Sequence, residues 1–209
     1  MAKLYFRYGA MNSGKSTALL QAAYNYEERG QRVLLAKPAV DTKGDRSIES
    51  RLGVTREVDY VIEPGEDAFA QFQRHRRESL DRDGVDISCL LVDEAQFLEG
   101  PQVDGLLRVA LLEGVPVLAY GIRTDFLTEA FPGSRRLLEV AHTLEELKTI
   151  CRCGRKALFN GRKVGDRFVF DGDQVAIDGE EVTYESLCGN CYLEESGNVI
   201  GAHPTLSPP

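Results

Sequence analysis

The pattern Gly-x4-Gly-Lys-Ser at residues 9–16 constrains this chain more than any other feature. An alternating aromatic and charged stretch, Lys3 to Tyr8, precedes it, and apolar residues at helical spacing follow it from Ser16 to Arg29. A glycine-rich loop between a strand and a helix lets successive backbone N–H groups surround phosphate oxygens. The pattern therefore predicts a phosphate-binding loop made of Gly9, Ala10, Met11, Asn12, Ser13, Gly14, Lys15 and Ser16.

A second element complements this loop. Cys89 to Asp93 is an apolar stretch that ends in a carboxylate, which is what holding a magnesium ion beside bound phosphates requires. Lys15 would neutralise phosphate oxygens, and Ser16 and Asp93 would lie on the magnesium side. Glu94 follows directly, so we expect it to be the general base for a substrate hydroxyl or for water.

Short apolar runs, typical of buried strands, alternate with segments of helical periodicity. The runs cover residues 32–37, 87–92 and 115–120, and the helical segments cover residues 67–80 and 101–113. Gly30 and Gly114 suit helix ends, and Pro101 suits a first helical turn. This alternation predicts an α/β fold with a parallel sheet flanked by helices on both faces. The Thr-x-x-Glu pattern at Thr143–Glu146 predicts one more short helix, ending before Cys151.

Four of the five cysteines form two close pairs. Four thiolates complete a tetrahedral zinc site and leave no open position, so the site should be structural. Buried free thiols and oxidation remain the alternatives. The predicted ligands are Cys151, Cys153, Cys188 and Cys191. Cys89 lies within an apolar run, and we expect it to be a core residue.

The composition changes after the first cysteine pair, where glycine and charged residues become frequent. Asp171-Gly172-Asp173 is a hairpin signal between residues 167–170 and 174–177. We therefore predict a phosphate-binding α/β domain (1–149), a small β-rich zinc-binding lobe (150–193) and a mobile C-terminal tail (194–209).

Charge and hydropathy narrow the classes of function. The formal net charge is −8, which argues against a broad surface for nucleic acid and favours a small-molecule substrate. Apolar runs fall short of the roughly 20 residues that a membrane-spanning helix needs. The first residues lack the pattern of a secretory signal. We therefore expect a cytoplasmic enzyme that binds neither membranes nor nucleic acid.

The segment Asp93-Glu94-Ala95-Gln96-Phe97, together with residues 9–16, residues 120–126 and the four late cysteines, resembles the thymidine kinase family of bacteria, animal cytosol and poxviruses. The resemblance extends from about Lys3 to Tyr192 with the motifs in the same order. It implies a RecA-like core, ATP as phosphoryl donor, Mg²⁺, a structural Zn²⁺ and usually a homotetramer. The implied reaction phosphorylates the 5′-hydroxyl of thymidine, and of deoxyuridine, for DNA precursor salvage.

The resemblance also assigns residues. Glu94 matches the catalytic base, and Asp93 to Gln96 would accompany the phosphate loop in binding ATP and magnesium. The substrate residues implied are Met11, Phe126, Phe131, Arg162, Val175, Ala176, Ile177, Asp178, Gly179 and Tyr184. Phe126 would stack on the base, the backbone of 175–179 would read its edge, and Arg162 would either reach the triphosphate or order the enclosing loop. From the residues alone, core packing is the favoured interpretation of Phe126 and Phe131.

Two departures from the family pattern leave details open. Residues 41–46 replace an Asp-Thr-Arg-Tyr element, so Lys43, Arg46 and Arg51 all remain candidates for a role near the substrate. Asn160 stands where several relatives have threonine or an apolar residue, which bears on the fit around the thymine methyl group.

Two other classes of protein share parts of the pattern. Asp93-Glu94-Ala95-Gln96 is also similar to the acidic box of nucleic-acid-stimulated motor ATPases, but such motors close ATP between two lobes and this chain has length for one. A non-catalytic nucleotide switch with a zinc lobe that recruits a partner is the third possibility.

Overall fold

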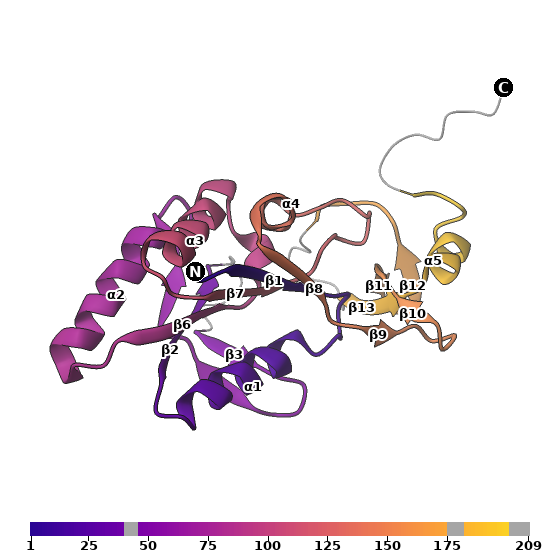
Figure 1. The fold of residues 1–209 in the computed structure, drawn as a ribbon. Helices are drawn as coiled ribbons and strands as arrows, with labels where there is room; N and C mark the ends of the chain where they lie inside the picture. Colours follow the sequence, from indigo (N-terminus) through magenta and orange to yellow (C-terminus); the bar gives the residue numbers. More distant parts are fainter. Residues whose placement is uncertain (40–45, 175–181, 201–209) are drawn as a thin grey trace.

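The computed structural model describes residues 1–39, 46–174 and 182–200. At its centre lies a six-stranded, entirely parallel sheet (Figure 1). Its strands, in spatial order, are β5 (Tyr60–Ile62), β2 (Arg32–Pro38), β6 (Ile87–Val92), β7 (Val117–Gly121), β1 (Leu4–Tyr8) and β8 (Thr143–Glu146). The predicted parallel sheet is confirmed.

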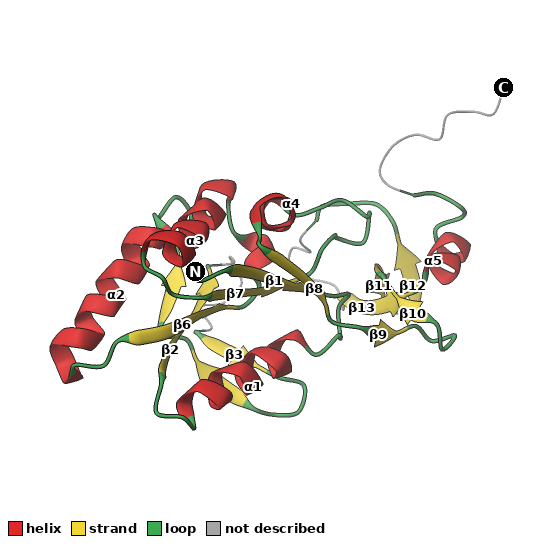
Figure 2. Ribbon diagram, viewed as in Figure 1, coloured by secondary structure: helices red, strands yellow, loops and turns green. Residues whose placement is uncertain are grey.

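Helices cover both faces of this sheet (Figure 2). α1 (Lys15–Glu27) packs on one face, and the other face carries α2 (Ala68–Asp83), α3 (Gly100–Leu112) and α4 (Pro132–Val140). Successive side chains of β2 point to opposite faces of the sheet, and both faces are buried. Leu34 and Ala36 join the core under α2 and α3, whereas Val33 and Leu35 join the core under α1.

The helix ends follow the predicted signals. Gly30 and Gly114, just beyond α1 and α3, have φ of 73° and 69°, a conformation that glycine adopts without strain. The Asp67 carboxylate caps α2 by accepting from the N–H groups of Phe69 and Ala70. Each helix lies within a few residues of its predicted range.

The predicted helix at Thr143–Glu146 is wrong, because these residues form β8 and pair in parallel with β1. The Thr-x-x-Glu pattern does not cap a helix. Instead, Glu145 accepts a hydrogen bond from Arg7 on β1 at 2.6 Å. Pairing with a distant strand outweighs the local signal here.

Several short elements have no clear sequence signal. β3 (Ser47–Glu49) and β4 (Thr55–Glu57) form a hairpin beside α1, and β5 and α4 are also short. A 3₁₀ turn, η1 (Ala95–Phe97), follows β6. Strands of three residues are too short to show alternation, so periodicity cannot find them.

The predicted β-rich lobe is present in the second part of the chain. It contains β9 (Thr149–Ile150), β10 (Lys156–Ala157), β11 (Phe159–Val164), β12 (Arg167–Val169), β13 (Val182–Leu187) and α5 (Gly189–Glu195). β11 is the centre of a three-stranded antiparallel sheet between β12 and β13. The proposed hairpin partner at 174–177 falls largely outside the described residues. α5 includes Glu194 and Glu195, the first residues of the predicted tail.

None of the helices in the described parts of the chain is long and apolar enough to cross a membrane.

Candidate functional site

The phosphate loop connects β1 to α1 at the carboxyl edge of the sheet. Gly14 precedes the helix with φ of 76°, in the left-handed region that glycine tolerates. A Cβ at Gly9 would lie 2.3 Å from Ser13 Oγ and 2.5 Å from the carbonyl oxygen of Leu147, so a side chain cannot fit there. The glycines of the pattern are therefore required by the shape of the loop.

Lys15 folds back over this loop. Its Nζ donates to the carbonyl oxygen of Ala10 at 3.0 Å. Burial lowers the pKa of Lys15, against the opposing influence of Glu94 and Asp93, and the charge of Arg51 lowers it further. A desolvated ammonium beside a second cation gains most from an anionic ligand, which would satisfy both charges.

Asp93 lies at the end of β6, with the intervening strand β7 between it and β1. Its Oδ2 accepts a hydrogen bond from Ser16 Oγ at 3.2 Å, so the two predicted magnesium-side groups are in contact. The carboxyl is 5% exposed. Burial, and then the neighbouring Glu94, raise the pKa of Asp93 to about 6. A bound cation would relieve both effects.

Glu94 has φ of 48°, which is unusual for a residue with a side chain and holds its carboxylate at the end of the sheet. Gln96 Nε2 donates to Glu94 Oε2, and Gln96 Oε1 accepts from the N–H of Ile122 at 3.2 Å. Gln96 is buried and links Glu94 to the loop after β7. The strained backbone and the amide together fix the direction of the Glu94 side chain.

A cavity of about 1460 Å³ opens in front of these groups. Lys15, Ser16 and Glu94 lie along it, and its wall continues to a group of aromatic and apolar side chains: Met11, Phe97, Ile122, Phe126, Phe131 and Tyr184. The predicted phosphate-side and base-side residues thus share one cavity. Its volume exceeds that of a typical small-ligand site, as two ligands side by side would need.

Neighbouring side chains support the phenylalanines of the cavity wall. Phe131 packs edge-on against Phe97 with ring centroids 5.4 Å apart. The carbonyl oxygen of Phe126 accepts from Tyr192 Oη of α5 at 2.7 Å. Both phenylalanines are buried, as core residues would be, yet both also line the cavity. Phe126 and Phe131 therefore combine both predicted roles, since each packs in the core and also lines the cavity.

Arg162 is 6% exposed and lies behind the cavity wall. Its Cζ is 3.7 Å from the centroid of the Phe126 ring, and its Nε donates to Tyr184 Oη at 3.3 Å. Nη2 donates to the carbonyl oxygens of Asp173 and Gln174 at 2.7 and 2.9 Å. These contacts place the guanidinium beside residues 173 and 174, which precede the segment predicted to read the base edge, and they favour loop ordering over contact with a triphosphate.

Some predicted residues cannot be placed. Val175, Ala176, Ile177, Asp178 and Gly179 lie outside the described residues, as does Lys43. Of the other two open candidates, Arg46 and Arg51 both line the cavity.

Asn160 is a site residue that the motifs did not identify. It lines the cavity from β11, and its Oδ1 accepts from the N–H of Met11 at 2.7 Å. On the neighbouring strand β13, Ser186 Oγ donates to the carbonyl oxygen of Met11. The phosphate loop is thus bonded directly to the small lobe. The departure from the family pattern at Asn160 was the one available signal.

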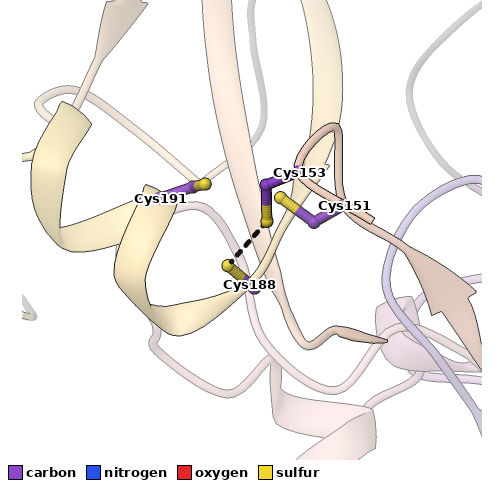
Figure 3. Close-up of side chains that lie close together, drawn as sticks. All are labelled: Cys151, Cys153, Cys188 and Cys191. Atoms are coloured by element: carbon purple, nitrogen blue, oxygen red, sulfur yellow. Dashed lines mark hydrogen bonds between the residues drawn. The ribbon is translucent and has the colours of Figure 1, made fainter. Parts of the chain in front are cut away.

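The four predicted cysteines come together between the β9–β10 turn and α5 (Figure 3). Their sulfur atoms lie within 4.8 Å of one another, and Cys153 Sγ is 3.5 Å from Cys188 Sγ. In a zinc tetrahedron with bonds of about 2.3 Å, sulfur atoms are about 3.8 Å apart. The backbone N–H of Cys191 lowers the pKa of Cys188 to about 6, which favours the thiolate. The cluster can therefore hold a metal ion with little movement.

Taken together, these groups can bind a polyanion and a divalent cation at one end of a cavity and a flat apolar group at the other. The carboxylate of Glu94 lines the same cavity. This arrangement suits transfer of a phosphoryl group to a hydroxyl on a ring-bearing ligand.

Known proteins are similar in sequence to this chain over most of its length. The family model described as thymidine kinase matches residues 2–192. A thymidine kinase of Mesorhizobium japonicum is 47% identical over 199 residues, covering 94% of each chain. One of Ruegeria pomeroyi is 46% identical, covering 95% of this chain and 97% of its own. One of Enterobacteria phage T4 is 45% identical, covering 90% and 94%.

The raised pKa of Asp93 predicts a pH-dependent stability difference between the wild type and Asp93→Asn. With magnesium chelated, ionised Asp93 destabilises the folded wild type, so its stability relative to the variant should fall as pH rises from about 4 to about 6 and stay constant above. The change should be on the order of 1 to 3 kcal/mol, at about 1.4 kcal/mol per unit of pKa. Urea unfolding at several pH values measures it. A pH-independent difference would contradict the prediction.

Proposed function

This chain belongs to the thymidine kinase family, and we propose that it transfers the γ-phosphate of ATP to the 5′-hydroxyl of thymidine. The observation that carries the proposal is the shared cavity, which has Lys15, Ser16 and Glu94 at one end and Phe126 and Phe131 at the other. The product, a deoxynucleoside monophosphate, would serve as a precursor for DNA synthesis.

The chemistry divides among the phosphate-side residues. Backbone N–H groups of residues 9–16 and the ammonium of Lys15 would hold the ATP phosphates. Mg²⁺, when bound with ATP, would neutralise charge on the transferred phosphoryl group, and Ser16 and Asp93 would hold its coordination shell. Glu94, fixed by Gln96, would accept the proton of the 5′-hydroxyl as that oxygen attacks.

The aromatic end of the cavity would bind the base. A planar uncharged ring gains from the faces of Phe126 and Phe131, and Tyr184 would close the site. The backbone of 175–179 would read the base edge, and Arg162 would order the start of that segment through the carbonyls of Asp173 and Gln174. An apolar pocket discriminates weakly against a ligand that lacks one methyl group, so deoxyuridine, which lacks the 5-methyl group of thymidine, should also be accepted.

Arg51 is the best candidate for a second phosphate-binding cation. It lies in the turn of the β3–β4 hairpin and lines the cavity. Its charge is close enough to Lys15 to lower the pKa of that ammonium. Within the described part of the chain, no hydrogen bond or ion pair engages its guanidinium. Two neighbouring cations repel each other until an anion binds between them.

The cysteine cluster would hold one Zn²⁺ in a structural role. The lobe has a small apolar cluster made of Ala157, Leu187, Tyr192 and three of the cysteines. A core of this size stabilises little by itself, so metal binding would add folding free energy directly.

We propose residues 1–149 as the catalytic domain, 150–193 as its zinc lobe and 194–209 as the tail. The family resemblance also supports a homotetramer and a cytoplasmic location, both of which stand as proposals. Native mass spectrometry would measure the assembly.

Glu94→Gln should reduce kcat for thymidine by about 10²- to 10⁴-fold, the usual contribution of a general base. The amide keeps the size of the side chain but cannot take a proton. Monophosphate formation from Mg-ATP and a panel of nucleosides measures the effect. Glu139→Gln, at an exposed position on α4, is the matched control. ATP hydrolysis stimulated by single-stranded DNA, without a nucleotide product, would instead favour a motor ATPase.

Arg51→Ala should weaken use of ATP by about 10- to 100-fold in kcat/KM, the value of one or two charge-assisted hydrogen bonds. Arg56→Ala is the matched control, because Arg56 lies on the same hairpin but pairs with Glu27. Initial rates at varied ATP concentration measure both. Equal effects of the two substitutions would show that the hairpin, not the charge of Arg51, matters.

The purified chain should contain one zinc per molecule, and Cys191→Ser should lower both zinc content and activity. The loss of one thiolate opens the site, and the lobe then loosens around β11 and β13. Cys89→Ala is the control, because Cys89 is a buried free thiol in the sheet core. Elemental analysis and melting temperature measure the outcome. Full activity of a zinc-free Cys191→Ser chain would contradict a structural role.

A further inference from the structure

Three separate parts of the site meet at the side chain of Asn160. Oδ1 accepts from the N–H of Met11 in the phosphate loop at 2.7 Å, and Nδ2 donates to the carbonyl oxygen of Thr124 at 2.8 Å. Asn160 itself belongs to β11 of the small lobe. One amide thus joins the phosphate loop, the segment that carries Phe126 and the lobe.

The orientation of this amide is determined by its partners. A backbone N–H can only donate and a backbone carbonyl can only accept, so rotating the amide by 180° would break both bonds. Asn160 is 2% exposed, so water cannot replace either partner without cost. One acceptor site and one N–H of the amide are thus engaged by the backbone of its neighbours.

Another residue of the small lobe, Ser186, also bonds to Met11 of the phosphate loop. Ser186 lies directly opposite Asn160 in the β11–β13 pairing, and its Oγ donates to the carbonyl oxygen of Met11. Both backbone polar groups of Met11 are therefore held by one cross-strand pair. The position of Met11 cannot change unless the lobe moves with it.

The Thr124 partner belongs to a segment that is tied together by its own internal contacts. Thr124 forms an isolated bridge with Ala130, and the Asp125 carboxylate accepts from the N–H groups of Leu127 and Glu129, both at 2.8 Å. Phe126, on the cavity wall, lies inside this segment. Phe126 on the cavity wall and the carbonyl that Asn160 binds are therefore parts of one hydrogen-bonded segment.

We propose that Asn160, assisted by Ser186, couples occupancy of the nucleoside pocket to the conformation of the phosphate loop. It is a positioning residue for phosphoryl transfer. The inference rests on the proposed thymidine kinase activity. When the nucleoside orders the Thr124–Ala130 segment, Asn160 is held in place and in turn holds Met11. The phosphate loop has then already lost its conformational entropy, so the donor nucleotide binds it more tightly.

The test measures this coupling directly. The dissociation constant of thymidine is determined by calorimetry with and without a saturating, non-hydrolysable Mg-ATP analogue, using zinc-loaded full-length protein. The wild type should bind thymidine about fivefold or more tightly with the analogue present, the lower end of typical coupling. Asn160→Leu, which has no donor for Thr124, and Asn160→Asp, whose ionised carboxylate can only accept, should reduce this ratio to about one.

Asn25→Asp makes the same chemical change at an exposed position on α1 and should leave the ratio unchanged. Ser186→Ala removes one hydroxyl and should lower the ratio partially, so it carries the test if both Asn160 variants fail to fold. Zinc content and melting temperature identify folded protein.

Two results would overturn the proposal: no coupling in an active wild type, or wild-type coupling in folded variants. Thymidine turnover by the wild type is measured first and separates the two questions. Absence of turnover rejects the proposed function, whereas turnover with an unchanged ratio rejects only the role of Asn160.

Discussion

All six strands of the central sheet run in one direction, so every functional group that follows a strand must share the small space at one edge. The phosphate loop leaves β1 there and Asp93 leaves β6, with β7 separating them. The consequence is a concentration of partly desolvated charge. Burial lowers the pKa of Lys15 and raises the pKa of Asp93, and bound ligands would restore part of the solvation that both groups lack.

The sequence predicted the parts of the fold whose signals are local. The phosphate-loop pattern, the apolar runs of β2 and β6, and the glycine stops after α1 and α3 all depend on neighbouring residues. The four cysteines could be grouped for a similar reason, since close pairs of thiols have a distinctive spacing. In the site, Lys15, Ser16 and Asp93 were identifiable because their chemistry requires fixed residue types.

The remaining parts depend on pairing between distant segments, which spacing does not encode. β8 looked like a capped helix because its partner, β1, lies more than a hundred residues earlier. Arg162 has no signal in its own neighbourhood, since its contacts with Phe126 and Gln174 arise from the fold of the lobe. Asn160 is similar: the sequence marked it only as a departure from the family pattern, and its role depends on two backbone partners that are distant in the chain.

The attachment of Met11 to both Asn160 and Ser186 has a consequence for how such enzymes can diverge. Although the small lobe follows the α/β core in the chain and has its own metal-binding cluster, it cannot be exchanged as an independent module. A lobe transplanted from another family member would need to bring side chains of matching reach at both positions. Substitutions at residues 160 and 186 should therefore be accompanied by substitutions in the loop between Gly9 and Gly14. A hybrid that changes only one of these regions would contain all the site residues, but the phosphate loop would be displaced relative to the small lobe.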